Sequence, residues 1–267
     1  MTKNTNINDA EAKVSNFYNT VGWEGESGVT EDARQWEDGR WCSEEYISKC
    51  RYRVLRHIPD AGDYLLDMAS GPIQYPEYLD YSKGFKKRYC VDLSSKALEG
   101  AQQRIGEHGV FLHGSFLEID LEENFFDCAV SLHTIYHMDK DCQEDAVRRL
   151  LFVTKPNKPV IIVYSNPDNI ISRLLFFLRK MVGKRETSED KDLYFHQHSN
   201  HWWSRFEDEA QVKILPWRSL STRVQKKLIP NNIIGRGILS ILFFFEDRFP
   251  NFFVKHFSYS MIIMIKR

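Results

Sequence analysis

Short apolar runs recur along the middle of the chain, and most of them are separated by a segment long enough for a helix. The runs lie at residues 64–68, 88–92, 109–113, 126–132 and 160–164. Runs of this length between turn residues are typical of buried strands. Strands that alternate with helices predict a parallel sheet, and right-handed crossovers bring the carboxyl ends of its strands to one edge. We therefore predict an α/β fold with its ligand site at that edge.

Apolar residues at helical spacing predict the helices between these strands. The helices are expected at residues 43–57, 75–81, 94–108 and 141–154. Ser94 or Ser95 is a suitable N-cap for the third of them. Two more strands are predicted at residues 212–217 and 256–266, with a helix at 202–210 before the first. Residues 1–13 are polar, and we expect them to lack stable structure.

The first strand ends on an acid and runs directly into a turn of small residues. Asp67 is followed by Ala69, Ser70, Gly71 and Pro72. Small residues after the first strand allow backbone N–H groups to approach a cofactor closely. Ala69 and Ile73 stand where a dinucleotide-binding loop has glycines, so the pattern favours a cofactor that lacks a pyrophosphate.

The second strand also ends on an acid, Asp92, which lies 25 residues after Asp67 and precedes Leu93. An acid at this position can accept hydrogen bonds from the two hydroxyls of a bound ribose. The third strand leads into a turn at residues 114–116, and the fourth leads into His133. We expect these residues to meet at the edge of the sheet.

Five motifs, in their order along the chain, resemble those of class I S-adenosylmethionine-dependent methyltransferases. They lie at residues 65–72, 91–94, 113–115, 126–137 and 154–161. The resemblance covers roughly residues 60–166 and implies a Rossmann-like fold. Such a fold has a mostly parallel seven-stranded sheet with helices on both faces and an antiparallel last strand. The resemblance also implies S-adenosyl-L-methionine as the cofactor and S-adenosyl-L-homocysteine as the product.

The resemblance further implies which residues bind the cofactor. In the family the turn after the third strand binds adenine, often through an acid, and Ser115 stands in that place here, beside Phe116. An N-terminal segment often folds over the cofactor, so Tyr18 and Trp23 either close the site or pack on the surface. The implied cofactor-binding residues are Asp67, Ala69, Ser70, Gly71, Pro72, Asp92, Leu93, Gly114, Ser115, Phe116, Ser131, Leu132 and Tyr18.

Methyl transfer requires mainly that the acceptor approach in line with the activated methyl group. A hydroxyl acceptor must also lose a proton, and His133 is our candidate for the catalytic base, with acceptor binding and packing as alternatives. The candidates for acceptor binding are His133, Tyr136, His137, His196, His198 and His201. The last three residues could also bind zinc, but no acid or cysteine completes a ligand shell, so acceptor binding, a role as base, or a solvated or packing role is favoured and we expect no metal.

Two apolar stretches at helical spacing, residues 169–182 and 223–253, exceed the minimal fold. They form a cap over the acceptor, pack on each other and on the sheet, or make a dimer interface. A cap of this kind would suit an acceptor that is bulky or partly apolar. We divide the chain into an N-terminal lid (1–58), a cofactor-binding core (59–166) and a C-terminal part with helical cap insertions (167–267), all in one integrated domain.

Charge and cysteine content narrow the partners and the compartment. The chain has 36 basic and 37 acidic residues, so nucleic acid is not favoured as a substrate. Its five cysteines lack metal-site spacing and are typical of free thiols in a reducing compartment. We find no signal peptide or transmembrane segment and expect a cytoplasmic protein. Peripheral membrane contact and the oligomeric state stay open.

The sequence therefore predicts a methyltransferase that acts on a small-molecule acceptor. We expect O-methylation in glycan, glycolipid or specialised-metabolite biosynthesis, with N- or C-methylation of a small metabolite as the alternative. A non-catalytic scaffold that retains the fold is a further alternative, favoured by the glycines lost at Ala69 and Ile73. The same loss argues against a dehydrogenase that uses a nicotinamide dinucleotide.

Overall fold

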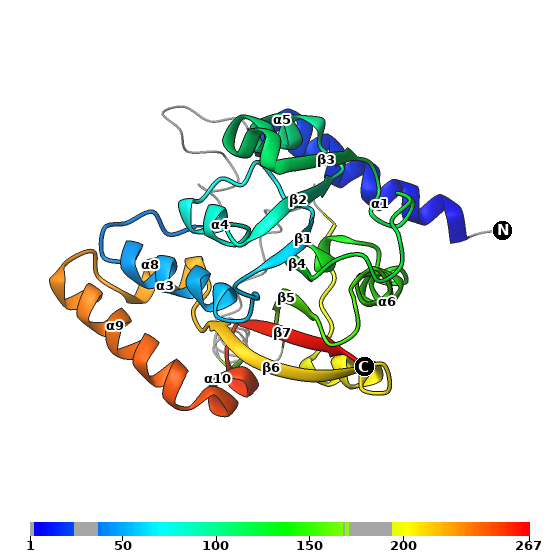
Figure 1. Ribbon diagram of the computed structural model, residues 1–267. Coiled ribbons are helices and arrows are strands. Elements are labelled where there is room, and N and C mark those ends of the chain that lie inside the picture. The colour runs from blue at the N-terminus through cyan, green and yellow to red at the C-terminus, as the bar shows by residue number, and fades with distance from the viewer. Residues whose placement is uncertain (1–2, 24–36, 168, 171–193) are drawn as a thin grey trace.

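A seven-stranded sheet forms the centre of the protein, and helices cover both of its faces (Figure 1). The computed structural model describes residues 3–23, 37–167, 169–170 and 194–267. Most of the helix expected at residues 169–182 lies outside the described residues.

The strands are β1 (Gly62–Met68), β2 (Phe85–Asp92), β3 (Gly109–His113), β4 (Cys128–Leu132), β5 (Pro159–Ser165), β6 (Ala210–Arg218) and β7 (Tyr259–Lys266). Their order across the sheet is β3-β2-β1-β4-β5-β7-β6. The first five strands pair in parallel, and β7 runs antiparallel between β5 and β6. The predicted sheet is therefore confirmed. Because β6 is antiparallel to β7, it runs in the same direction as β1–β5 and ends at the same edge.

The helices are α1 (Lys3–Phe17), α3 (Glu44–Leu55), α4 (Pro76–Asp80), α5 (Ser95–Ile105), α6 (Gln143–Val153), α8 (Thr222–Leu228), α9 (Ile233–Arg248) and α10 (Pro250–His256). Shorter turns are the π-helix η1 (Tyr18–Gly22) and the 3₁₀ helices η2 (Gly106–His108), η3 (Ile135–His137) and η4 (Asn200–Phe206). The Ser94 hydroxyl caps α5 by accepting a hydrogen bond from Ala97 N, as predicted. None of the described helices combines the length and apolar character needed to cross a bilayer.

Two expectations about helices are wrong. Residues 3–13 belong to α1 rather than to an unstructured end, and α1 is anchored from its C-terminal half, where Ser15 Oγ donates to Leu93 O at 3.2 Å. The helix expected at residues 202–210 is the 3₁₀ helix η4, which ends at Phe206 and leaves Ala210 to open β6.

Alternate residues of the strands pack against helices on opposite faces of the sheet. Leu65 of β1 packs in one core with Tyr46 and Val54 of α3, whereas its neighbour Leu66 packs on the other face with Leu150 of α6. Successive side chains of a strand point to opposite faces, so these neighbours separate. The sheet is thus covered by α3 on one side and by α6 on the other, and its carboxyl edge stays open for a site.

A buried ion pair fixes the C-terminal insertion to the sheet. Arg53 of α3 donates to Glu246 of α9 at 2.7 Å, and both side chains are at most 2% exposed. The Glu246 carboxylate also accepts hydrogen bonds from Tyr46 Oη at 2.7 Å and from Ser219 N at 3.0 Å. Arg53 additionally donates to Trp217 O at 2.7 Å. Helix α9 is therefore held on α3 and on the end of β6.

We predict that Glu246→Ala destabilises the protein by about 3–5 kcal/mol, because the substitution leaves the Arg53 charge buried without its partner. Urea unfolding followed by circular dichroism measures the loss. Glu45→Ala is the matched control, since Glu45 is 42% exposed and pairs with Lys49 on the surface. Its loss should stay below about 1 kcal/mol. Equal losses for the two variants would contradict this account.

Candidate active site

A cavity of about 250 Å³ lies at the carboxyl edge of β1, β2 and β4. Many of the residues that line this cavity are predicted from the sequence. The predicted residues that line the cavity are Tyr18, Asp67, Ala69, Ser70, Gly71, Pro72, Asp92, Leu93, Gly114, Phe116, Leu132, His133, Tyr136 and His137. Residues from the N-terminal segment and from β6 and β7 complete the wall. The edge is therefore the site that the strand pattern predicts.

The first loop keeps a glycine-like backbone without the glycines. Ala69, Gly71 and Ile73 all have positive φ, at 55°, 56° and 52°. Side chains rarely adopt this region, and each non-glycine residue there costs on the order of 1–3 kcal/mol. Ile73 is fully buried beside Cys90 and Leu98, so packing holds it there. Ala69 and Ile73 thus adopt a backbone conformation that glycine favours, although neither is a glycine.

The carboxylate of Asp92 joins the loop to the second strand. It accepts hydrogen bonds from Gly71 N at 2.9 Å and from Ser94 N at 2.8 Å. Burial raises the pKa of Asp92 to about 6. Asp67 also lines the cavity, but its carboxylate is bound by the Arg88 guanidinium. Asp92 is therefore the acid of this pair that is less tightly engaged.

Helix α1 brings a second carboxylate to the cofactor side of the cavity. Ser115 Oγ donates to Glu11 Oε1 at 2.6 Å, and it is Glu11, not Ser115, that lines the cavity. Burial raises the pKa of Glu11 above its usual value. The turn after β3 carries no acid at Ser115, and the Glu11 carboxylate lies beside it. Sequence reasoning missed Glu11 because nothing in α1 marks it as facing the sheet.

Two aromatic rings cover the loop. The rings of Tyr18 and Trp23 are stacked at 5.0 Å, and both residues line the cavity. A Cβ placed on Gly71 would lie 3.1 Å from the Trp23 ring, so the indole rests directly on the loop backbone. Both residues therefore line the cavity beside the first loop.

The other end of the cavity surrounds His133. Its ring lies 4.4 Å from Trp217 and 5.4 Å from Tyr259, measured between ring centroids, and its Nδ1 lies 3.2 Å from Tyr136 Oη. Burial, reinforced by the positive charge of Arg218, lowers the pKa of His133 to about 3. His133 is therefore neutral at any ordinary pH.

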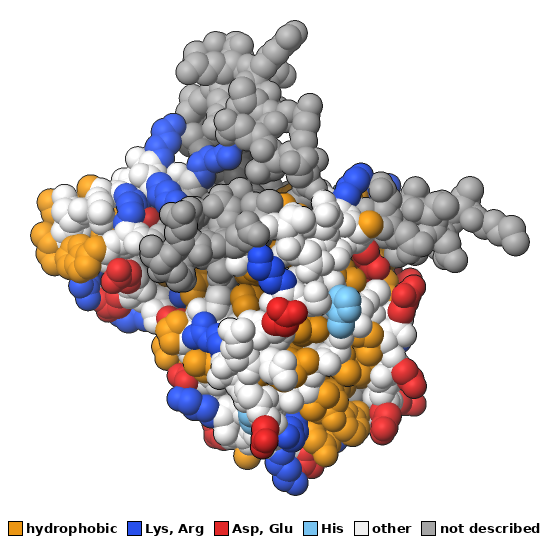
Figure 2. All heavy atoms as spheres, turned by 90° about the horizontal axis from the view of Figure 1, so that it is seen from above, with side chains coloured by type: hydrophobic (Ala, Val, Ile, Leu, Met, Phe, Trp, Pro, Cys, Tyr) orange, Lys and Arg blue, Asp and Glu red, His pale blue; other side chains and the backbone are white. Residues whose placement is uncertain are grey.

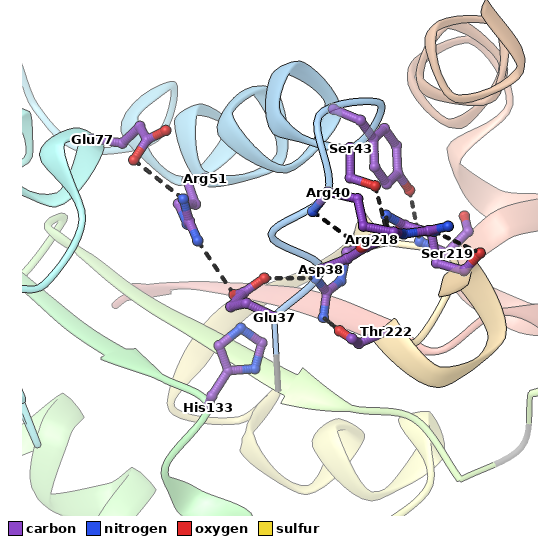
Figure 3. Close-up of polar contacts among 12 residues, drawn as sticks. Glu37, Asp38, Arg40, Ser43, Arg51, Glu77, His133, Arg218, Ser219 and Thr222 are labelled. Atoms are coloured by element: carbon purple, nitrogen blue, oxygen red, sulfur yellow. Dashed lines mark hydrogen bonds and ion pairs between the residues drawn. The ribbon is translucent and has the colours of Figure 1, made fainter. Parts of the chain in front are cut away.

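Charged residues absent from our sequence predictions complete this end. Glu37 and Arg218 line the cavity and form an ion pair at 3.2 Å (Figure 3). Arg218 is the last residue of β6, so its position at the carboxyl edge is readable in retrospect from the strand pattern. Glu37 follows a polar segment that carries no such signal.

Five predicted binding residues do not line the cavity. Ser115 is engaged by Glu11, and Ser131 is buried within β4. The three remaining residues, which lie beyond the cavity wall, are His196, His198 and His201. The His198 ring stacks on Trp202 at 4.5 Å, which fits the packing alternative. Among the described residues, no group of three His, Cys, Asp or Glu side chains is arranged to hold a metal ion.

The insertion at residues 223–253 does not cap the cavity. Its helices α8, α9 and α10 contribute no lining residue, because α9 packs on α3 instead. The other proposed cap segment lies outside the described residues. Of the alternatives stated above, packing on the body of the protein fits the second insertion.

Residues 66–162 match the model of a family described as a methyltransferase domain. This match identifies a methyltransferase domain in the central part of the chain. The matched range holds the first loop, Asp92 and His133, and the sheet has the seven strands and the antiparallel last strand that the sequence resemblance implies. No curated protein matches the chain by sequence.

Solved methyltransferase structures share the fold at low sequence identity. Geranyl diphosphate C-methyltransferase from Streptomyces coelicolor A3(2), in complex with S-adenosyl-L-homocysteine, matches at 12% identity and a TM-score of 0.59, over 97% of this chain and 98% of that one. Magnesium protoporphyrin IX methyltransferase from Synechocystis PCC 6803 matches at 12% identity and 0.58, over 97% and 100%. A phosphoethanolamine N-methyltransferase from Haemonchus contortus matches at 13% and 0.53, over 91% and 60%.

We predict that the methyltransferase binds S-adenosyl-L-homocysteine more weakly below pH 6. Ribose hydroxyls donate to the ionised form of Asp92, and the raised pKa means that this form is lost as the pH falls through about 6. Affinity should be level above pH 7 and fall by up to about tenfold per pH unit below 6. Isothermal calorimetry between pH 5 and 8 measures it.

The control for this prediction is Asp92→Asn, which has no charge to titrate. The variant should bind weakly, with an affinity that stays level across the same pH range. Equal affinity of the unaltered protein at pH 5 and pH 8 would refute the role of Asp92.

Proposed function

We propose that this methyltransferase transfers a methyl group to an oxygen of a small-molecule acceptor in glycan, glycolipid or specialised-metabolite biosynthesis. The cavity itself carries the proposal, since one concave space joins the cofactor loop to the aromatic pocket around His133. Its volume of about 250 Å³ suits a small molecule better than a polymer.

The residues at the first loop fit the cofactor of the family. Asp92 suits the ribose hydroxyls, and Gly71, where the backbone has positive φ, admits a close approach that a side chain would block. Glu11 and Phe116 flank the turn after β3 and suit the adenine amino group and ring face. S-adenosylmethionine supplies an activated methyl group when bound. The chain then has to orient the acceptor and exclude water.

His133 suits orientation better than proton removal. A pKa of about 3 makes its imidazole a weak proton acceptor. It can accept or donate a hydrogen bond, but it holds a proton poorly at neutral pH. We therefore propose that His133, with Tyr136, aligns the acceptor. The favoured acceptor atoms are oxygens that ionise readily, such as those of carboxyl or phenol groups.

N-methylation is the second candidate, and the same observation favours it. A neutral amine attacks a methyl group without prior deprotonation, so a weakly basic His133 is no obstacle. C-methylation usually requires a stronger base. The scaffold alternative rested on the absence of glycines at Ala69 and Ile73, and it loses support because both residues adopt the positive φ that glycine favours. A reducing, cytoplasmic location stays our proposal, since all five cysteines are free thiols.

Thermal unfolding with S-adenosylmethionine, S-adenosylhomocysteine or NAD tests the cofactor end. We expect both adenosyl compounds to raise the unfolding midpoint, because a ligand at a hundredfold excess over its dissociation constant adds about 2.7 kcal/mol. NAD should have no effect. Asp92→Ala should abolish the shift, whereas Asp120→Ala, which removes an exposed carboxylate, should preserve it.

Product analysis with deuterated methyl donor tests the acceptor end. Incubation with a panel of carboxylic acids, phenols and amines should label oxygen, and His133→Ala should lower kcat more than cofactor affinity. Label found in amines alone would replace the proposal with N-methylation. Stabilisation by NAD, or by none of the three ligands, would refute the cofactor assignment.

A further inference from the structure

Arg218 is buried in the cavity with incomplete polar contacts. Its side chain is 3% exposed. Nη1 donates to Glu37 at 3.2 Å, Nη2 lies 3.5 Å from Thr222 Oγ1, and Nε is buried without a partner. The guanidinium lies 5.0 Å from the Trp217 ring and 5.1 Å from the Tyr259 ring. A guanidinium has five donors, and here they are only partly used.

Arg51 repeats this pattern on the opposite side of Glu37. It contacts Glu37 and Glu77 at 3.4 Å each, and its Nε is also buried without a partner. Figure 3 shows the Glu37 carboxylate lying between Arg51 and Arg218. One carboxylate is thus shared by two guanidinium groups, and Arg218 has no other anionic partner among the described residues.

The long contacts distinguish this cluster from the other buried ion pairs. Arg40 reaches Asp38 at 2.7 Å, and Arg53 reaches Glu246 at 2.7 Å. Charge-assisted hydrogen bonds normally fall between about 2.7 and 2.9 Å. The Glu37 carboxylate lies between two guanidinium groups and forms a short charge-assisted hydrogen bond with neither. A buried charge with incomplete pairing raises the free energy of the folded protein. A ligand that completes the pairing therefore gains binding free energy.

We propose that the acceptor carries an anionic group, a carboxylate or a phosphate, that binds Arg218 and replaces Glu37 as its partner. This inference rests on the proposed function and names the acceptor class. The planar guanidinium suits both groups in a bidentate arrangement. Tyr259 lines the same cavity and suits an apolar or aromatic body next to the charge.

Calorimetry on the protein saturated with S-adenosylhomocysteine tests the inference. The probes are benzoate and phenyl phosphate, with benzamide as the uncharged match. We expect at least one anion to bind and benzamide to bind at least tenfold more weakly. The two anions distinguish a carboxylate acceptor from a phosphate acceptor.

Variants separate the role of Arg218 from general charge. Arg218→Gln should weaken anion binding by roughly tenfold to a hundredfold. Arg218→Lys keeps the positive charge but lacks the two parallel N–H donors of the guanidinium, so it should lose less affinity for the anion. If Arg218→Gln does not fold, Arg218→Lys provides the test. Glu37→Gln should strengthen anion binding by removing the competing carboxylate. Arg236→Gln is the control, because Arg236 pairs with Glu45 on the surface.

The outcomes separate this inference from the proposed function. Equal affinity for benzoate and benzamide would overturn the inference of an anionic acceptor. The methyltransferase proposal would still hold if the protein binds S-adenosylhomocysteine. Unchanged anion binding in Arg218→Lys and Arg218→Gln would also overturn it. Absence of S-adenosylhomocysteine binding would count against the proposed function itself.

A second, independent observation concerns the outer face of α9. The inner face of this helix packs on α3 through Leu239, which is fully buried. The large side chains that the outer face exposes, together with their neighbours on α8 and α10, are Leu228, Ile233, Ile234, Ile238, Ile241, Phe244, Phe245, Phe249 and Phe252. We call this set the α9 outer face. Protein surfaces rarely carry so many large apolar side chains in one place without a partner.

The three helices that carry the α9 outer face also carry basic residues. Arg223, Lys226 and Lys227 lie on α8, Arg248 ends α9 and Lys255 lies on α10, and none of these forms an ion pair with another described residue. The acids of this segment, Glu246 and Asp247, are neutralised by arginines of α3. Figure 2 shows apolar side chains gathered at the left end, where α9 lies in Figure 1, with Lys and Arg side chains nearby.

We infer that the α9 outer face binds the surface of an anionic lipid bilayer. Bulky Ile and Phe side chains bordered by Lys and Arg are typical of helices that lie in the membrane interface. A protein partner would more often meet Tyr, Trp and Arg at the centre of the contact. The 16 residues of α9 make a helix of about 24 Å, suited to lying on a bilayer rather than crossing it.

Vesicle co-sedimentation tests this second inference. The protein should sediment with phosphatidylcholine vesicles that contain phosphatidylglycerol, less with phosphatidylcholine alone, and less at high salt. The double variant Ile241→Gln, Phe244→Gln should bind at least tenfold more weakly. Phe152→Gln, at an exposed phenylalanine of α6, is the control. Failure to sediment, or a dimer in solution that the double variant dissociates, would overturn the inference in favour of a protein partner on this face.

Discussion

The cofactor end of the site depends on the hydrogen bonds that tie the first loop to β2. Ala69 N donates to Val91 O at 2.7 Å, and Gly71 N donates to the Asp92 carboxylate at 2.9 Å. These bonds require the parallel register that places Asp67 opposite Cys90. A slip of one residue would turn Asp92 to the other face of the sheet. The register of two central strands thus determines whether the loop and the acid can act together.

The acceptor end has a different structural origin. Arg218 reaches the edge because β6 runs parallel to the central strands, and that direction depends on the antiparallel β7 between them. Glu37 comes from the N-terminal part of the chain and Arg51 from α3. The ion pairs of Glu37 with Arg51 and Arg218 hold these distant segments together near His133. The two ends of the cavity therefore rest on separate parts of the fold, and the acceptor end is free to vary without disturbing the loop.

Much of this arrangement is readable from local patterns. Each strand and most helices follow from apolar periodicity, and the loop and Asp92 follow from acids at strand ends. Glu11 does not, because its contact with Ser115 joins residues 104 positions apart. Similarly, the contact between Glu37 and Arg218 spans 181 positions. The position of the histidine cluster likewise depends on contacts between distant segments. His196 N donates to Tyr136 O, and the His198 ring packs on Trp202 rather than lining the cavity.

The unusual residues of the first loop bear on conformational entropy. Glycine at positions 69 and 73 would relax the strain of positive φ, yet it would also give the loop many more conformations before a ligand arrives. Alanine and a buried isoleucine restrict that freedom, and Ile73 is locked by its packing. The loop is thus ordered when the chain folds, and little further ordering is left for the moment of binding. Ala69 and Ile73 thus have two effects: they strain the backbone at positive φ, and they make the binding loop rigid.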